Sequence, residues 1–141
     1  MDMFLGTHGG CIGETCTVAL IIGGIYLLVR RVITWHIPVI LIGTVFVLSL
    51  FSTGFNVAES LSLIMAGGLF IGAIFMATDY VTTPITTRGR VVFALGCGVI
   101  TFIIRYFCAY PEGVSFSILI MNILTPFIEK WTAKEPLGGV K

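Results

Sequence analysis

Three ionisable residues stand out in this sequence because they lie in or beside long apolar stretches. Asp79 directly follows one such stretch, Glu129 ends another, and Arg105 lies inside a third. Charged side chains are costly to place in a membrane, and those found there often serve ions, protons or ligands. Asp79 and Glu129 are therefore candidate transport residues, and Arg105 is a candidate counter-charge for a ligand phosphate.

Each of the acidic candidates also has a structural explanation, and the sequence leaves both explanations open. Asp79 could cap its loop or pair with Arg88 or Arg90. Glu129, like Glu59, could be a charge at the membrane interface.

Two further polar residues need partners if their stretches cross a membrane. Arg105 could extend to the interface or pair with Glu112. Asn122 lies in the middle of an apolar stretch, so we expect it to bond within the helical bundle.

A glycine-rich turn, GGCIGET at residues 9–15, precedes the first apolar stretch. Glycines at such a position can break a helix and aim backbone N–H groups at an anion or a ring edge. Gly13, Glu14 and Thr15 are therefore candidate ligand contacts. The alternative is a capping turn with a solvated carboxylate.

No spacing in the sequence is typical of a metal site, a redox disulfide or a nucleophile with its base, so no catalytic residue and no metal ligand are predicted. If the apolar stretches cross a membrane in the orientation predicted below, His8 and His36 lie on opposite sides of it and cannot share a metal. The cysteines lack CxxC spacing and are expected to be scattered core thiols: Cys11, Cys16, Cys97 and Cys108.

The composition excludes most soluble proteins. Of 141 residues, 57% are hydrophobic and 11% are charged, whereas soluble domains carry about 25% charged residues. The mean hydropathy is +1.06, and the net charge of +1 gives no basic surface for nucleic acid. An integral membrane protein remains.

Membrane helices are the structures expected to carry these residues. A helix needs about 20 mostly apolar residues to cross the bilayer core, and backbone groups in lipid must bond within their own segment. The apolar stretches do not alternate as barrel strands do. The sequence predicts a single all-α transmembrane domain over residues 1–141, with about five spans near 11–29, 36–53, 57–77, 91–109 and 114–128.

Basic residues predict the orientation. Seven of the eight Lys and Arg residues fall in the first loop, the third loop and the tail, and none falls in the N-terminal segment, the second loop or the fourth loop. Because cytoplasmic loops carry the excess of Lys and Arg, we expect the N-terminus outside and the C-terminus in the cytoplasm. An odd number of spans is the form expected of one half of an inverted repeat.

Glycine is dense, with 17 residues, and several lie inside the predicted spans. Gly68 and Gly72 have the small-xxx-small spacing that lets helices approach closely. Tight helix packing is the favoured interpretation, and room for a flat cofactor or an ion path is the alternative.

Four blocks of residues occur along nearly the whole chain. They are FLG (4–6) with GGCIGET (9–15), WHIP (35–38), FMATDYVT (75–82) with TRGR (87–90), and IR (104–105) with YPEGVSF (110–116) and Asn122. Together, and in this order, they resemble the NqrB/RnfD family, which contains the RnfD subunit of the Rnf ion-translocating ferredoxin:NAD oxidoreductase and, more distantly, the NqrB subunit of the sodium-pumping NADH:quinone oxidoreductase.

The resemblance implies the C-terminal half of a ten-helix subunit, with the N-terminal half absent. It also implies FMN, which the family esterifies to a threonine in a Ser-Gly-Ala-Thr motif that this sequence lacks. The turn of Gly13, Glu14 and Thr15 would lie near the flavin. Asp79 and Glu129 match positions where the family keeps acidic residues linked to ion uptake.

By resemblance, the chain is one of the subunits of an electron-transport complex in a bacterial inner membrane, with the other membrane subunits as partners. Electron transfer between ferredoxin and NAD, via flavin, would drive Na⁺ or H⁺ translocation, although no complete catalytic site is visible in this chain. The alternatives are half of a transporter or channel that dimerises around a solute path, or a truncated inactive fragment.

Overall fold

The computed structural model describes residues 17–65, 68–79, 81–108 and 112–132, and these residues contain helices and no strands. The all-α fold predicted from composition is therefore confirmed for the described part of the chain. The predicted residues His8, Cys11, Gly13, Glu14, Thr15 and Cys16 lie outside it.

Each of the five predicted apolar stretches contains helix. The helices are α2 (Thr17–Val29), α3 (His36–Ser52), α4 (Val57–Met65), α5 (Leu69–Ile71), the π-helix η1 (Gly72–Met76), α6 (Thr87–Phe107) and α7 (Gly113–Thr132).

Helix length limits how many crossings can be counted among the described residues. α6 and α7 are long and apolar enough to cross a membrane. α4 and the α5–η1 segment add a third span if they count together, with a bend of 66° between them. α2 and α3 are apolar but shorter than 18 residues. The structure thus supports two or three spans by this criterion.

Two helices extend beyond the predicted bounds of their apolar stretches: the fourth begins earlier and the fifth ends later. α6 begins at Thr87, because the Thr86 side chain caps it by accepting a 3.1 Å hydrogen bond from the Gly89 N–H. Arg88 and Arg90 therefore belong to the first turn of α6 and not to a loop. α7 continues through Pro126 to Thr132, so Glu129 lies in the last turn of the helix and not after it.

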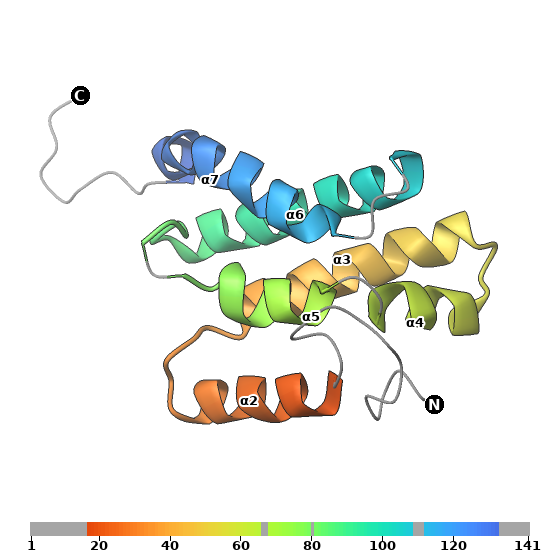
Figure 1. Ribbon diagram of the computed structural model, residues 1–141. Coiled ribbons are helices and arrows are strands. Elements are labelled where there is room, and N and C mark those ends of the chain that lie inside the picture. The colour runs from red at the N-terminus through yellow and green to blue at the C-terminus, as the bar shows by residue number, and fades with distance from the viewer. Residues whose placement is uncertain (1–16, 66–67, 80, 109–111, 133–141) are drawn as a thin grey trace, which may run out of the picture.

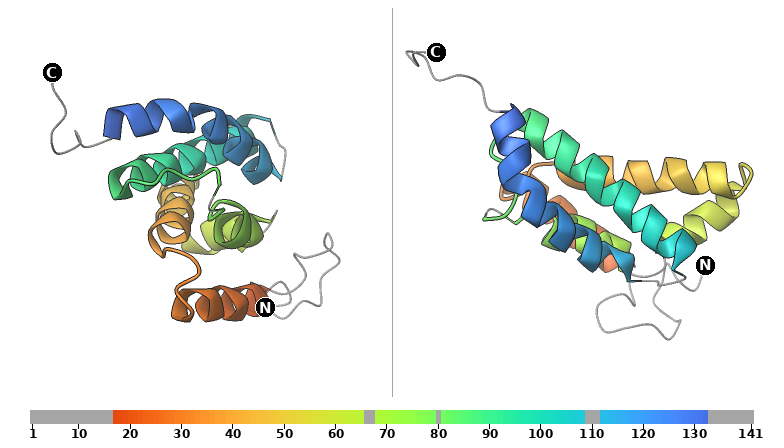
Figure 2. Two further views of the ribbon diagram at one scale, coloured as in Figure 1. Left: turned by 90° about the vertical axis from the view of Figure 1, so that its left-hand side faces the viewer. Right: turned by 90° about the horizontal axis from the view of Figure 1, so that it is seen from above.

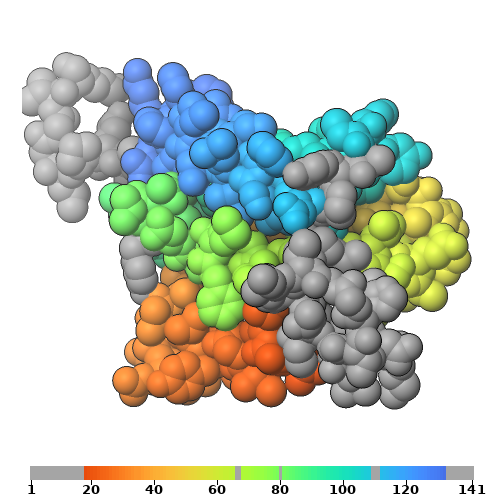
Figure 3. Space-filling view, in the orientation of Figure 1, coloured from red at the N-terminus to blue at the C-terminus, as the bar shows by residue number. Residues whose placement is uncertain are grey.

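α6 is the central helix, packed on α3 along one side and on α7 along the other. In Figure 1, α7 and α6 lie above α3, while α2 lies below it and packs mainly on α5 and η1. The left view of Figure 2, turned about the vertical axis, keeps this order. The space-filling view shows η1, in green, between α7 and α2 (Figure 3).

Glycines permit the closest approaches, as the favoured interpretation of the sequence required. A Cβ at Gly98 on α6 would lie 2.7 Å from the Cβ of Thr44 on α3. A Cβ at Gly72 would overlap Cγ1 of Val114 on α7. Both approaches are closer than carbon atoms tolerate, so these helix pairs fit only without a side chain.

Candidate functional site

The connection from η1 to α6 carries Asp79, the first acidic candidate. Its exposed carboxylate accepts two long contacts from its own loop, 3.5 Å from the Val81 nitrogen and 3.4 Å from the Thr82 hydroxyl. Its backbone carbonyl accepts from the Thr83 hydroxyl. These bonds organise the loop, and they leave the carboxylate open to solvent.

Glu129, the second acidic candidate, ties that same connection to α7. Its Oε1 accepts a 3.1 Å hydrogen bond from the Ile85 N–H. One turn further on, the hydroxyls of Thr86 and Thr132 lie 2.8 Å apart and share a hydrogen bond. The last turn of α7 thus fixes the residues that lead into α6.

The two acidic candidates share one end of the bundle. The η1–α6 connection and the C-terminal end of α7 lie at the left of Figure 1, together with the α2–α3 connection. The described basic residues outside the apolar stretches lie on these segments or in the first turn of α6, which directly follows the η1–α6 connection: Arg30, Arg31, Arg88, Arg90 and Lys130. Basic groups are therefore concentrated at this end of the described structure, and Asp79 and Glu129 lie among them.

The third apolar stretch is broken in its middle. Gly68 begins α5 with a φ of 67°, a left-handed conformation that glycine adopts at little cost. The chain then forms the π-helix η1, in which the Ala77 N–H donates to the Gly72 carbonyl at 2.7 Å. Discontinuous helices and π-helices occur frequently at functional sites.

Arg105 lies against the first half of this broken segment. Its Nη1 donates a 2.7 Å hydrogen bond to the carbonyl oxygen of Leu63, in the last turn of α4. A cavity of about 150 Å³ lies beside this contact, bordered by Ser49 and Ser52 of α3 and by Tyr106. The sequence did not predict this pairing between α6 and α4.

Two buried hydroxyls join α6 to α7. Thr101 Oγ1 and Ser117 Oγ lie 2.6 Å apart, and both side chains are fully buried. Each also lies 2.7 Å from a carbonyl of its own helix, at Cys97 and Val114 respectively. The sequence gives one indication of this contact, since Thr101 and Ser117 are hydroxyl residues inside apolar stretches.

The side-chain oxygen of Asn122 does not have the partner that was expected from the sequence. Its Oδ1 is buried, and no hydrogen-bond partner for it occurs in the described part of the bundle. No group of three or more His, Cys, Asp or Glu side chains that could hold a metal ion occurs among the described residues either.

The described cavities do not fit FMN. The larger, of about 610 Å³, is lined by aliphatic and aromatic residues, methionine, glycine and proline, so its walls offer no side-chain hydrogen bond to the polar edges of a flavin ring. The smaller has polar walls but a volume of about 150 Å³, below the roughly 300–1,000 Å³ of ligand pockets. A flavin site made from these residues alone is not supported.

Comparison with known proteins gives a family match over almost the entire chain. The NQR2, RnfD, RnfE family matches residues 1–138.

Curated relatives match the chain just as extensively. The D subunit of the proton-translocating ferredoxin:NAD(+) oxidoreductase complex of Clostridium ljungdahlii is 50% identical over 139 residues, which are 96% of this chain and 42% of that protein. The D subunit of the Na(+)-translocating ferredoxin:NAD(+) oxidoreductase complex of Acetobacterium woodii is 46% identical over 142 residues, 99% of this chain and 43% of that protein. The D subunit of the ion-translocating oxidoreductase complex of Stutzerimonas stutzeri is 42% identical over 133 residues, 92% of this chain and 38% of that protein.

The chain spans about two fifths of the length of the curated relatives that it matches. The activities that their names print belong to complexes of several subunits, and two of these names differ in the ion that is moved.

Proposed function

This chain belongs to the NQR2, RnfD, RnfE family, and from that premise we propose that it serves as a membrane subunit, or part of one, in an ion-translocating ferredoxin:NAD oxidoreductase complex. The observation that carries the proposal is the 50% identity to such a subunit over 96% of the chain. The all-helical described structure, with two or three helices able to cross a membrane, agrees with that role. The partners would be the other membrane subunits of the complex.

We propose five crossings of a bacterial inner membrane as a single domain, with the C-terminus in the cytoplasm. Helix in each of the five apolar stretches supports the number. The concentration of Arg30, Arg31, Arg88, Arg90 and Lys130 at one end of the bundle supports the orientation.

Asp79 and Glu129 would lie at the cytoplasmic entrance of an ion path. Their location at the same end of the bundle supports this role, since an ion entering there would meet two carboxylates within the basic end. Asp79 is exposed and its oxygens make only long contacts, so it is the better placed of the two to take up a cation.

The ion-path proposal predicts impaired coupling in the complex that carries Asp79→Asn. Ion uptake into inverted membrane vesicles, driven by ferredoxin oxidation, should fall, while Glu59→Gln should behave as wild type. Glu59 is an exposed carboxylate in the first turn of α4, away from the basic end. Normal coupling in Asp79→Asn would remove this residue from the path.

FMN is proposed as a cofactor of the complex from the family resemblance, with Gly13, Glu14 and Thr15 as its candidate contacts in this chain. The two cavities described above do not suit a flavin. When bound, a flavin would supply one- and two-electron transfer.

Flavin content tests the electron-transfer role against its main alternative. The chain should purify with flavin only when its partner subunits are present, and its own band should show no flavin fluorescence after denaturation. A second function, half of a transporter, is favoured by the broken third segment, since transporters bind solutes at broken helices. Solute transport by the chain alone, without flavin in the full assembly, would support that function instead.

A further inference from the structure

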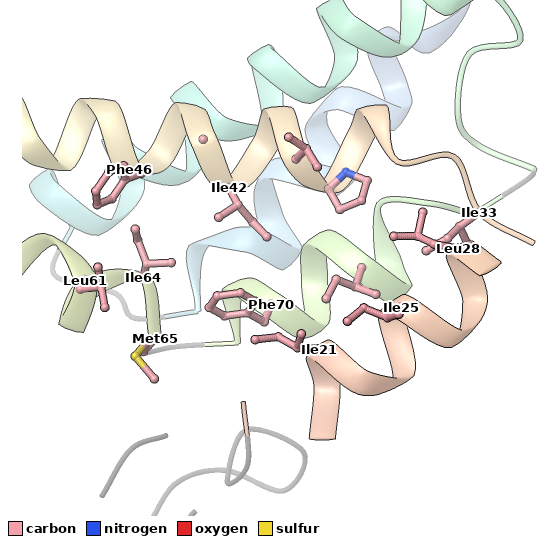
Figure 4. A pocket seen from close by; sticks show the side chains of 15 residues that line it. Ile21, Ile25, Leu28, Ile33, Ile42, Phe46, Leu61, Ile64, Met65 and Phe70 are labelled. Carbon is pink, nitrogen blue, oxygen red and sulfur yellow. The ribbon is translucent and has the colours of Figure 1, made fainter. Parts of the chain in front are cut away.

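An apolar groove of about 610 Å³ lies between α2 and the helices α3, α4 and α5. Figure 4 shows its side chains running from Leu28 and Ile33 at one end to Phe46 and Leu61 at the other. Because the lining is apolar throughout, neither water nor a polar ligand would find hydrogen-bond partners within it. A hydrocarbon chain suits such a surface.

The groove follows the helix axis of α3. Its lining residues on this helix run from Pro38 to Phe46, a rise of about 12 Å at 1.5 Å per residue. Gly43 lies within that run, and a Cβ added there would meet nothing within 4 Å. The groove therefore extends along α3, with open space beside Gly43.

One end of the groove carries two adjacent positive charges. Arg30 and Arg31 lie between the lining residues Leu28 and Ile33 in the chain, and both are exposed. An anionic group at this end would complement them, while the opposite end of the groove reaches α4 at Leu61.

The backbone around these arginines is unusual. α2 ends in a Schellman motif, with hydrogen bonds of 3.0 Å from the Val32 N–H to the Leu27 carbonyl and from the Arg31 N–H to the Leu28 carbonyl. The left-handed position of this motif is normally glycine, but here it is Arg31 with a φ of 55°. The chain thus holds a guanidinium where glycine would fit the backbone better.

An aromatic pair marks the level of the membrane surface at this end. Trp35 is 57% exposed and stacks on His36 with ring centroids 4.2 Å apart. Exposed tryptophan is typical of the headgroup region, where its ring can lie between lipid and water. A lipid headgroup at this level would lie beside the arginines.

We propose that the groove binds one acyl chain of an anionic phospholipid, with the headgroup phosphate at Arg30 and Arg31. The acyl chain of the lipid enters the groove past Leu28 and Ile33 and runs along α3 toward Phe46. The site is independent of the electron-transfer role, because none of its residues belongs to the proposed ion path or flavin contacts.

Photo-crosslinking in the assembled complex tests the site. The complex is reconstituted with a trace of phosphatidylglycerol that carries a diazirine in one acyl chain, and the adducts are mapped by mass spectrometry. Adducts should concentrate on Ile42, Phe46 and Phe70, and not on the exposed α7 side chains Ile123 and Phe127. Unlabelled phosphatidylglycerol should compete more strongly than phosphatidylcholine.

Two variants separate the headgroup from the groove. Arg31→Gly relieves the left-handed backbone, so it should fold, and it should reduce the preference for the anionic lipid about fivefold. Arg88→Gln, which removes an exposed arginine away from the groove, should keep the preference. Gly43→Leu should fill the groove and remove its adducts, whereas Val47→Leu, on the same helix outside the lining, should not.

Four results would overturn the proposal. The first three are equal competition by the two lipids in the wild-type complex, adducts spread evenly over the groove and the α7 surface, and unchanged anionic preference in Arg31→Gly. Absence of adducts in the groove because a protein segment fills it would also overturn the proposal. If Gly43→Leu fails to fold, the wild-type and Arg31→Gly results still decide the question.

Discussion

Nη1 of Arg105 on α6 binds the carbonyl oxygen of Leu63 on α4 at 2.7 Å, at the point where α4 ends. The last carbonyls of a helix have no partner within it, and the helix dipole makes this end attractive to cations. In broken transporter helices, such carbonyl ends can coordinate a mobile cation. Here the Leu63 carbonyl oxygen accepts a hydrogen bond from a cation of the protein itself, the Arg105 guanidinium.

Replacing Arg105 should therefore destabilise the fold through α4. We expect Arg105→Leu to lower the free energy of unfolding by about 1.5–3 kcal/mol, the range for a hydrogen bond to a charged group. Unfolding of the detergent-solubilised chain measures this loss, and hydrogen exchange of the α4 amides should increase. Arg88→Leu is the matched control and should change neither, since Arg88 is exposed in the first turn of α6. Unchanged exchange in α4 would contradict the role assigned to Arg105.

Gly98 and Gly43 give a matched pair of glycines, both within helices. We expect Gly98→Ala to cost about 1–3 kcal/mol, because its Cβ would meet Thr44 Cβ at 2.7 Å and the Leu41 carbonyl oxygen at 3.2 Å. Gly43→Ala should be neutral or stabilising by up to about 1 kcal/mol, since its Cβ meets open space and alanine favours helix. Thermal unfolding of the two variants in one detergent makes the comparison. Equal stability would show that α3 and α6 do not approach at Gly98.

The hydroxyl pair of Thr101 and Ser117 should contribute a measurable coupling between α6 and α7. A double-mutant cycle with Thr101→Ala and Ser117→Ala should give about 0.6 kcal/mol, the average for hydrogen bonds between membrane helices. Thr125→Ala is the control, because its hydroxyl bonds only the Met121 carbonyl of its own helix. The effects of Thr101→Ala and Thr125→Ala on the free energy of unfolding should be additive. A coupling between them as large as that between Thr101→Ala and Ser117→Ala would refute the assignment of the coupling to the Thr101–Ser117 contact.

Two substitutions of Glu129 separate the effect of its charge from the effect of its hydrogen bond. In Glu129→Gln the side-chain oxygen can still accept from the Ile85 N–H, so hydrogen exchange at Ile85 should stay slow. In Glu129→Ala the bond is lost, exchange should accelerate, and stability should fall by about 0.5–1.5 kcal/mol.

Ion coupling in the two Glu129 variants then assigns the role. If Glu129 serves the ion path, coupling should fall in both variants. Full coupling in Glu129→Gln, with loss only in Glu129→Ala, would show that Glu129 acts only by holding the η1–α6 connection.

The sequence predicted helices but not how they contact one another. Apolarity marked all five helical stretches, because a lipid environment demands it along the whole element. The break at Gly68 was not predicted, since hydropathy is the same for a continuous and a broken span. Its one signal was the Gly67-Gly68 pair inside an apolar stretch.

The sequence predicted which residues belong to the candidate site, but it did not predict the contacts that these residues make. Asp79 and Glu129 were identified by charge, and the basic end was identified from loop composition. The Glu129–Ile85 bond and the Arg105–Leu63 bond join residues 44 and 42 positions apart. Such pairs depend on how helices pack, which one sequence without its relatives does not record.

The position of α2 has a consequence for biosynthesis. α2 packs mainly on α5 and η1, which follow it in the chain only after the whole of α3 and α4. A chain emerging from the ribosome therefore releases α2 well before its packing partners exist. During that interval the apolar faces of α2 must be covered by lipid or by the insertion machinery, and the helix docks only when the broken segment has been synthesised.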